Sequence, residues 1–558
     1  MCAALALVPL DDAAAIHVRV NQAGYRPRDP KIAVALSRAP LPSRFSVADA
    51  ATRRIVFRGD ARAIAGGWGE LAYHAELDFS ALQDSGRYLI RIGESTSPAV
   101  NVTPAAYRAI PARLLEFMRQ QRCGTNPWLG VMCHQRDGRT AYGPLPPGTQ
   151  IDATGGWHDA GDQLKYLLTS SNATAQLLLA AQLGDRSPEL EDEARWGIDW
   201  MLKLHPSPDQ LYHQVADDRD HAGWRLPQDD RADYGWGPGG ARVVYFADGK
   251  PQGLRAFKSE STGVANLAGR YAAAMALGYQ LWKDDRLLAA GREVYALGKA
   301  HEGVQQGNSY GAPYRYEETT WTDDMEWGAA ELFRATRERA YLDDAKRYAA
   351  MAAAESWMGR ERANHYQYYP FMNLGHFRLH DLVDAQDRRT LAGYYAEGLE
   401  RARRAAAANP YGVGVPFIWC SNNLVVALAT QAALYEKLTG SRRYRVFASR
   451  QRDWLLGRNP WGMSMFTGVP ADGVSPRDVH LFATALLGRT VSGGLVDGPV
   501  ARAVFQSLKG VSIRLPDPLA AFQDDRAVYH DDISDYSTNE PTMDGTASAI
   551  LMFAALPR

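Results

Sequence analysis

Short stretches in which hydrophobic and polar residues alternate fill the first part of the chain. Residues 17–22, 31–36 and 86–93 show this alternation, and turn residues such as the run RPRDP separate the stretches. Alternation with a period of two is typical of half-buried β-strands. About seven such strands between residues 16 and 104 predict a small all-β sandwich of the immunoglobulin type.

The pattern changes at residue 105, where Ala- and Leu-rich segments with helical spacing begin. Residues 177–202, 272–291, 329–350 and 428–456 each read as two helices joined by a short polar turn. Repeated helical hairpins of this kind stack side by side, either as a closed toroid or as an open solenoid. We therefore expect a mostly α-helical domain over residues 105–558. The long loops between its hairpins are where binding and catalysis are expected.

Composition narrows the classes of function. The 558 residues carry 62 Lys and Arg against 63 Asp and Glu, so the charge is nearly balanced and a basic nucleic-acid surface is not expected. No apolar run is long enough for a membrane span, and no protein partner is predicted. The 14 Trp, 27 Tyr and 16 Phe suit either a large core or platforms on which sugar rings stack.

The N-terminus reads MCAALALVPLDDAAA, a short apolar stretch that ends in small residues. It resembles the end of a secretory signal whose charged start is missing. We therefore expect a secreted or periplasmic protein, with Cys2 in a segment that is removed. Four cysteines are too few for a disulfide scaffold.

Two loops bring carboxylates to the start of apolar helices. The first, GGWHDAGD, places Asp159 and Asp162 beside Trp157. Helix capping by Asp is the alternative reading of this loop. The second, YHDDISDYSTNEP, ends at Glu540 just before the last helix, where a desolvated carboxyl would have a raised pKa and serve as a general acid. A surface acidic loop or a calcium site is the alternative there.

A third group combines two thiols with two imidazoles, which suits a closed tetrahedral zinc site. Its members are Cys123, Cys133, His134 and His158. A disulfide between the two cysteines is the alternative in an exported protein. A closed zinc site would clamp the loop that carries Asp159 and would be structural, because it leaves no position for substrate.

These motifs together resemble glycoside hydrolase family 9, the family of inverting β-1,4-glucanases. The resemblance rests on GGWHDAGD, the NEP loop, and LGRNPWGMSMFTG followed by His480. The segments DHAGWRLPQ, WCSNN and GGLVDGP fall in the family's order, and VRVNQAGYRP resembles the N-terminal immunoglobulin-like domain of one branch. The ordered set covers nearly the whole chain.

The resemblance implies an (α/α)6 barrel with an open cleft across one end. Asp162 would be the base that activates water, Asp159 would help to hold that water, and Glu540 would protonate the leaving oxygen. Inversion needs a carboxyl on each side of the scissile bond, roughly 6.5–9.5 Å apart. The branch also has a structural zinc, whose ligands match the Cys123, Cys133, His134 and His158 set. Bound calcium is frequent in the family, but no ligands are assigned for it.

The substrate contacts depart from the family pattern. After LGRNP the family usually shows two His and an Arg, whereas this chain has His480, Leu481 and Phe482. Further along, Gly545 and Thr546 replace the expected Asn and Ala. Loss of the Arg removes a fixed positive charge and a bidentate donor. The departures therefore affect the substrate more than the reaction.

Several aromatic side chains near these loops are candidate sugar platforms, together with His480. They are Trp157, Trp321, Trp419, Tyr529 and Tyr536. Core packing is the alternative for each. Trp321 belongs to residues 310–327, a stretch rich in acids and aromatics that we expect to be a loop forming a wall of the cleft.

Three functions are compatible with these observations. The first is an inverting hydrolase of β-1,4-glucan or cello-oligosaccharides, which the carboxylates and the motif order favour. The second is an exo-β-glucosaminidase acting on chitosan oligosaccharides, since the missing Arg and the acidic segment would tolerate an amino sugar. The third is a carbohydrate-binding protein without catalysis, against which the retained carboxylates argue.

Overall fold

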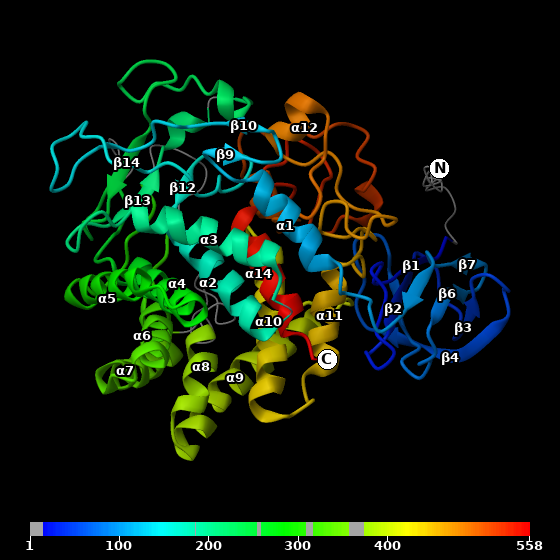
Figure 1. The fold of residues 1–558 in the computed structure, drawn as a ribbon. Coiled ribbons are helices and arrows are strands. Elements are labelled where there is room, and N and C mark those ends of the chain that lie inside the picture. Colours follow the sequence, from blue (N-terminus) through cyan, green and yellow to red (C-terminus); the bar gives the residue numbers. More distant parts are fainter. Residues whose placement is uncertain are drawn as a thin grey trace.

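The computed structural model describes residues 15–184, 186–221, 223–253, 258–308, 316–355 and 373–557. An all-β domain at the N-terminus packs against one side of a larger helical domain (Figure 1). The leader-like segment with Cys2 lies outside the described residues, as does the stretch 310–315 of the expected cleft wall. No helix in the described ranges is long and apolar enough to cross a membrane.

Antiparallel strands form the N-terminal domain, in the order β1-β2-β5-β4-β3-β6-β7, with β8 also paired to β6. The strands are β1 (His17–Arg19), β2 (Ile32–Ser37), β3 (Arg44–Asp49), β4 (Ile55–Ile64), β5 (Tyr73–Asp78), β6 (Gly86–Ile92), β7 (Ser95–Thr96) and β8 (Val100–Val102). The long strand β4 pairs with β3 through its first half and with β5 through its second, and so joins two layers. Val47, Leu77 and Ile90 are buried between them.

Two kinds of helix build the second domain, as their burial shows. The helices with buried surfaces nearly all round are α2 (Leu167–Leu183), α4 (Ala265–Trp282), α6 (Thr322–Thr336), α10 (Ser421–Thr439) and α14 (Met543–Ala555). The helices that bury one face are α1 (Ile110–Gln120), α3 (Pro188–Lys203), α5 (Asp285–Ala300), α9 (Ala385–Ala405) and α11 (Arg445–Leu455). A helix that is apolar all round must lie in the interior, whereas an amphipathic one covers it.

The interior helices lie side by side, in the order α6, α4, α2, α14 and α10. Four of them are covered by the helix that follows in sequence, as α3 covers α2 and α5 covers α4, whereas α14 is covered by α1. The remaining helices are α7 (Arg339–Glu355) and α8 (Leu374–Leu379), which pack on α6, and the short α12 (Phe482–Leu487) and α13 (Arg502–Gln506).

Short strands tie the loops together at one end of the interior helices. They are β9 (Thr125–Asn126), β10 (Val131–Met132), β11 (Arg139–Thr140), β12 (Lys165–Tyr166), β13 (Tyr212–Val215), β14 (Val243–Phe246), β15 (Leu495–Val496) and β16 (Pro541–Thr542). One sheet has the order β11-β14-β13-β12, and β15 pairs with β16. These pairings fix the loops that precede α2 and α14.

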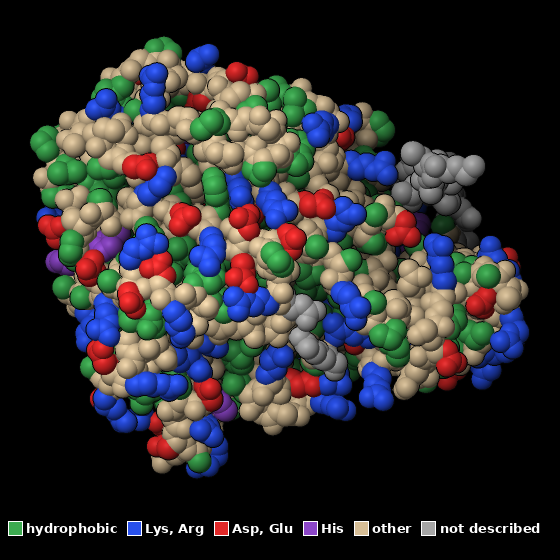
Figure 2. Space-filling model, in the orientation of Figure 1, with side chains coloured by type: hydrophobic (Ala, Val, Ile, Leu, Met, Phe, Trp, Pro, Cys, Tyr) green, Lys and Arg blue, Asp and Glu red, His purple; other side chains and the backbone are tan. Residues whose placement is uncertain are grey.

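Buried polar contacts join the two domains. The Asn21 side-chain amide donates to Asp453 Oδ1 at 2.7 Å, and Arg458 Nε donates to the Ile32 carbonyl at 2.8 Å. Trp68 is fully buried, and its ring meets those of Trp454 and Trp461 edge-on. The segment LGRNPWG, quoted above as a motif, therefore serves the domain contact. Over the face in Figure 2, positive and negative side chains are interspersed.

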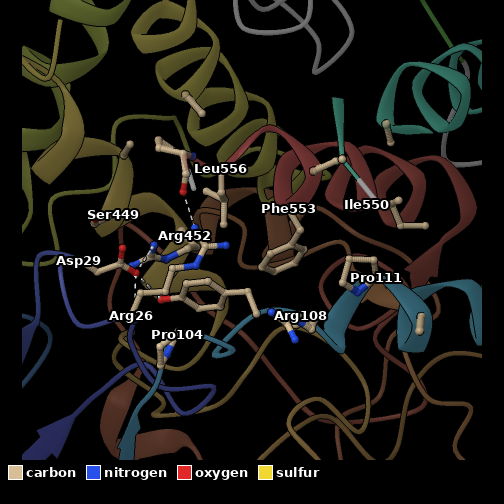
Figure 3. Close-up of a pocket in the computed structure, with 18 of the residues that line it drawn as sticks. Arg26, Asp29, Pro104, Arg108, Pro111, Ser449, Arg452, Ile550, Phe553 and Leu556 are labelled. Atoms are coloured by element: carbon tan, nitrogen blue, oxygen red, sulfur yellow. Dashed lines mark hydrogen bonds and ion pairs between the residues drawn. The ribbon is translucent and has the colours of Figure 1, made fainter. Parts of the chain in front are cut away.

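A cavity of about 1370 Å³ lies at the far end of the interior helices, beside the β-domain (Figure 3). It is lined by the C-terminal parts of α2, α10 and α14 and by the loop at residues 26–30. Arg452 and Asp29 form an ion pair within it at 3.1 Å. The candidate carboxylates instead precede the N-terminal ends of α2 and α14, so this cavity is separate from them.

Candidate active site

The two carboxylate loops meet although they lie far apart in sequence. The backbone N–H of Gly161 donates to Glu540 Oε1 at 2.8 Å, and Met543 N–H donates to the Asp159 carbonyl at 2.9 Å. A Cβ atom at position 161 would lie 2.6 Å from Glu540 Oε1 and 2.5 Å from the His480 carbonyl oxygen. Only glycine fits here, because a side chain would push the two loops apart.

Asp162 is the more accessible of the two carboxylates in the first loop. Its side chain is 20% exposed, its Oδ1 accepts from Leu164 N–H at 2.8 Å, and its Oδ2 lies 3.7 Å from His221 Nε2. Burial lowers the pKa of His221, but its contact with Asp162 and the negative charges of Asp162, Asp220 and Asp218 outweigh burial and raise it to about 9. His221 is therefore positively charged at neutral pH and holds Asp162 on one side.

Asp159 is buried, and each of its two carboxyl oxygens accepts a hydrogen bond. Thr169 donates to its Oδ1 at 2.6 Å, and the Tyr316 hydroxyl donates to its Oδ2 at 2.5 Å. Burial, followed by the negative charge of Asp162, raises the pKa of Asp159 well above its usual range. The side chain is thus fixed in orientation three residues before Asp162.

Glu540 has the surroundings of a proton donor. Burial raises the pKa of its carboxyl well above the usual range, and the charges of Asp497 and Asp162 raise it further. A carboxyl that keeps its proton near neutral pH can act as a general acid. Asp162 and Glu540 are both half-buried, but Asp162 lies beside a cation whereas Glu540 lies near other carboxyls, so their surroundings would suit a base and an acid respectively.

A row of rings crosses the same region. Trp224 lies 4.5 Å from His480, His480 lies 5.9 Å from Tyr536, and Tyr536 lies 5.7 Å from Trp419, all measured between ring centroids. His480 Nδ1 donates to the Ile533 carbonyl at 2.6 Å, which fixes the imidazole. Trp224 is 37% exposed and offers an open face. Such a row suits the apolar faces of successive sugar rings.

Two of the expected platforms belong to the core. Trp157 is fully buried, its Nε1 donates to Glu193 at 2.6 Å, and it packs on α3 at Gly197. Tyr529 is also fully buried, and its hydroxyl donates to Asn539 Oδ1 at 2.7 Å. Neither ring has a face for a sugar, so the platform prediction is wrong for both. Trp321 is half-buried and meets Tyr348 edge-on at the start of α6.

The departures from the family pattern have a structural basis. Leu481 and Phe482 are buried, so apolar packing occupies the positions where His and Arg were expected. A Cβ atom at Gly545 would lie 2.2 Å from Asn423 Oδ1, which excludes the expected Asn at this position. Residues 322–327, expected as part of a loop, form the first turns of α6.

The cysteine and histidine set forms a compact cluster. Ligand atoms of Cys123, Cys133, His134 and His158 all lie within 4.8 Å of one another. The Cys123 Sγ–His134 Nδ1 distance is 3.5 Å, and that between His134 Nδ1 and His158 Nε2 is 3.4 Å. Bond lengths of about 2.3 Å to sulfur and 2.0–2.1 Å to nitrogen give tetrahedral edges of roughly 3.3–3.8 Å, so the cluster fits zinc. Both cysteines are free thiols, not the alternative disulfide.

Neighbouring residues orient the side chains of the cluster and favour the thiolate form of Cys123. His134 Nε2 lies 3.1 Å from Asp230 Oδ2, an outer contact that orients the ring. Burial acts to raise the pKa of the Cys123 thiol, but the contact with Cys133 and the charge of Lys165 hold it well below its usual range. A thiolate is the form that binds a metal. His158 directly precedes Asp159 and so links the cluster to the carboxylates.

Four residues of the site escaped the sequence analysis. They are His221, Trp224, Tyr316 and Asp497. His221 and Trp224 lie in the quoted segment DHAGWRLPQ, and Asp497 lies in GGLVDGP. The motifs therefore include these residues, but their sequence does not indicate a role for them. For Tyr316, the only indication in the sequence was that it belongs to the segment 310–327, which is rich in aromatics and acids.

Comparison with known proteins identifies the class and then the family. The sequence model for glycosyl hydrolase family 9 matches residues 107–553, and the model for the cellulase N-terminal ig-like domain matches residues 13–97. The chain is therefore an O-glycosyl hydrolase. It belongs to glycosyl hydrolase family 9, as the resemblance indicated, and it carries the N-terminal immunoglobulin-like domain found in part of that family.

Curated relatives and solved structures agree with this assignment. Endoglucanase C of Cellulomonas fimi is 25% identical over 94% of this chain, which spans 50% of that protein's length. The xyloglucan-specific endo-beta-1,4-glucanase of Bacteroides ovatus is 25% identical over 86% of this chain and 85% of its own. A metagenome-derived family 9 endoglucanase superposes with a TM-score of 0.74 at 26% identity, covering 97% of this chain and 98% of its own. A Zn-binding triple mutant of the family 9 endoglucanase J30 gives 0.75 at 25% identity, covering 95% and 99%.

Proposed function

We propose that this chain hydrolyses β-1,4-linked glucan or cello-oligosaccharides with inversion at the anomeric carbon. Asp162 takes a proton from the attacking water, Asp159 helps to hold that water, and Glu540 protonates the leaving oxygen. The observation that carries the proposal is the meeting of the two loops at Gly161, which brings an accessible carboxylate and a desolvated carboxyl to one place. Family membership supports the bond class.

The stereochemistry of the product tests the mechanism. Proton NMR of the first product released from a cello-oligosaccharide is expected to show the α-anomer, because water attacks the face opposite the leaving group. Release of the β-anomer contradicts the proposal.

Substitution of each carboxyl separates the two roles. We expect Glu540→Gln to lower hydrolysis of cello-oligosaccharides by about 10²–10⁴-fold, the usual contribution of a general acid. The loss should be much smaller on an aryl cellobioside whose leaving group needs no proton. Asp162→Asn should lose activity on both substrates, because both need an activated water. Glu338→Gln, at a surface salt bridge, serves as the control.

No observation favours the glucosaminidase alternative. It rested on the missing Arg and on the acidic side chains of residues 310–327. Glu318 and Asp324 both form ion pairs with Arg270, at 2.5 and 2.7 Å, and Glu326 lies against His376 at 2.7 Å. These charges are already partnered inside the domain. Product profiles on cello-, xyloglucan- and chitosan-oligosaccharides compare the polymers directly.

We also propose that the helical domain, residues 105–558, closes as an (α/α)6 barrel. The interior order α6, α4, α2, α14, α10 supports a ring whose members are each covered by an outer helix. The helices α8 and α9 follow α6 and α7 in sequence and would complete it. The substrate cleft then lies at the end where α2 and α14 begin.

Zinc at the cysteine and histidine cluster is proposed to be structural. Cys123, Cys133, His134 and His158 would fill all four positions of a tetrahedral ion and hold the loop before Asp159. We expect metal analysis of the purified protein to find one zinc per chain, and Cys133→Ser to lose it and unfold at lower temperature. Cys420→Ser is the matched control and should keep the metal. A zinc-free protein of unchanged stability contradicts the proposal, and no ligands for calcium are assigned.

A further inference from the structure

A carboxyl group that the mechanism above does not use lies directly beside the proposed acid. Asp497 follows β15, and its backbone N–H donates to the Glu540 carbonyl oxygen at 2.8 Å. β15 and β16 are antiparallel with Val496 opposite Pro541, so Asp497 and Glu540 form the next pair along the ladder. Residues directly opposite each other in such a pair share one face of the sheet, with Cβ atoms roughly 4.5–5.5 Å apart.

Neutral donors hold the Asp497 side chain in place. Trp419 Nε1 donates to its Oδ2 at 3.0 Å, and the Cys420 thiol donates to its Oδ1 at 3.3 Å. The side chain is buried, and in the described ranges no Lys, Arg or His is paired with it. An uncompensated buried carboxyl is costly, so its retention beside the acid calls for a role.

The backbone that presents these donors is itself unusual. Cys420 has a φ of 57°, in the left-handed region that non-glycine residues rarely adopt. The Asn422 N–H two residues later donates to the Asp497 carbonyl at 2.9 Å. Residues 419–422 therefore hold both the side chain and the backbone carbonyl of Asp497. Strain of this kind persists where the surrounding structure enforces it, and it gathers at functional sites.

We propose that Asp497 is a positioning residue that keeps the proton on Glu540 until the glycosidic oxygen takes it. The inference rests on the proposed role of Glu540 as the acid. Two carboxyl groups this close in a buried site cannot both ionise readily, so the pair retains one proton over the pH range in which either alone would lose it. Burial, and after it the charge of Asp497, raises the pKa of Glu540.

Other titratable groups face this pair, and Asp497→Asn leaves all of them in place. They are Asp159, Asp162, Cys420, His480, Tyr536 and Asp544. A change in the pH profile of Asp497→Asn therefore reports the ionisation of Asp497. A role for Asp497 in packing alone would lower activity equally at every pH.

The pH dependence of kcat/KM on a cello-oligosaccharide tests the inference. Asp497→Asn removes the second ionisable carboxyl of the pair, so the basic limb, where Glu540 loses its proton, is expected to move to lower pH by about one unit. Activity below that limb should stay within a few-fold of the unsubstituted enzyme. Cys420→Ser keeps both the charge and a donor and should leave the limb in place. An unmoved limb in Asp497→Asn overturns the inference.

Two further measurements keep the outcomes distinct. If Asp497→Asn does not fold, carbon-13 NMR titration of carboxyl-labelled, unsubstituted protein is expected to show Glu540 titrating in two separated steps, and a single step overturns the inference. If Glu540→Gln retains full activity on cello-oligosaccharides, the proposed acid fails and this inference with it. If Glu540→Gln is inactive while the Asp497→Asn limb is unmoved, only the inference fails.

Discussion

Side chains of one chemical type have different properties at this site because their neighbours differ. Asp159, Asp497 and Glu540 are desolvated, and burial raises the pKa of each. Asp162, three residues from Asp159, is 20% exposed and lies beside the positively charged His221. Residue type alone therefore gives the list of candidates, while surroundings separate acid from base.

The Asp162–His221 contact predicts a pH-dependent contribution to stability. The folded-state pKa of His221 is about 9, above its unfolded value of about 6.5. Folding thus favours the protonated imidazole, and the stabilisation is fully present below pH 6.5 and lost as pH rises through 9. Replacing His221 by Gln should lower the melting temperature most below pH 6.5 and least near pH 10.

Thermal unfolding across this pH range measures the effect. His301→Gln, at an exposed histidine, is the control and should give a pH-independent difference from the unsubstituted protein. A His221→Gln difference that is constant, or that grows with pH, would contradict the assigned contact.

The glycine at 545 has no room for a side chain. A Cβ atom there would meet Asn423 Oδ1 at 2.2 Å and Thr542 Oγ1 at 2.7 Å. We expect Gly545→Ala to lower the free energy of unfolding by about 1–3 kcal/mol, as overpacking does. Gly393 lies in α9 with open space around it, so Gly393→Ala should stabilise by up to about 1 kcal/mol. Denaturant unfolding of both variants checks the pair, and equal effects refute the steric explanation.

At the residue scale, the sequence predicts which residues belong to the motifs, but it does not predict how exposed their side chains are. Trp157 and Tyr529 stand beside catalytic motifs, yet each fills the core. A buried aromatic residue and one that stacks on a sugar cannot be told apart by residue type. Trp157 is buried because it packs on α3, and Tyr529 is buried where its hydroxyl bonds to Asn539. Asp497 lies in the quoted segment GGLVDGP, but a single Asp among glycines has no spacing that indicates a role.

At the scale of secondary-structure elements, the row of aromatic rings depends on how several loops are placed, because each ring comes from a different loop. Trp224, His480, Tyr536 and Trp419 are brought into line from four separate segments. If sugar rings stack along it, Trp224→Ala should raise KM for cello-oligosaccharides about 2- to 12-fold, the equivalent of 0.5–1.5 kcal/mol for an aromatic contact. The kcat should change little, because stacking serves ground state and transition state alike.

Trp236 provides the matched control for this substitution. It is 39% exposed and lines a separate hollow with Gly240 and Gln150. Trp236→Ala should leave KM unchanged. Steady-state kinetics of both variants test whether Trp224 stacks on the substrate. If Trp224→Ala and the unsubstituted enzyme have the same KM, Trp224 is not part of the proposed platform.

Periodicity predicted the elements well where the pattern was long. The hairpins expected over residues 177–202 and 428–456 coincide with the junctions of α2 with α3 and of α10 with α11, although α2 and α10 begin earlier than those ranges. The segment 310–327 was expected to be a loop because acids and aromatics obscure its spacing. Its acids at 323, 324 and 326 are buried in α6, where Arg270 and His376 partner two of them, and such long-range pairing has no local signal.

At the scale of the whole molecule, Trp68 joins the two domains. It lies between β4 and β5, is fully buried, and donates from Nε1 to the Phe522 carbonyl at 2.9 Å. Replacing it by Ala should cost about 3–5 kcal/mol, the usual range for a buried Trp. Calorimetry should show a lower melting temperature and, because docking is weakened, separate transitions for the two domains.

Tyr73→Ala, at a ring that is 43% exposed on the same domain, is the control and should change stability little. One unshifted transition in Trp68→Ala would mean that the other polar contacts suffice to hold the domains together.

The contact between Gly161 and Glu540 spans 379 residues of sequence. The helix α14 lies between α2 and α10, two interior helices that are made before it. During synthesis, Gly161 is made 379 residues before its partner Glu540 emerges. A chain released before residue 540 lacks Glu540 and has an unfilled gap between two apolar helices. Such a truncated chain would be a substrate for chaperones and proteases, not a slow enzyme.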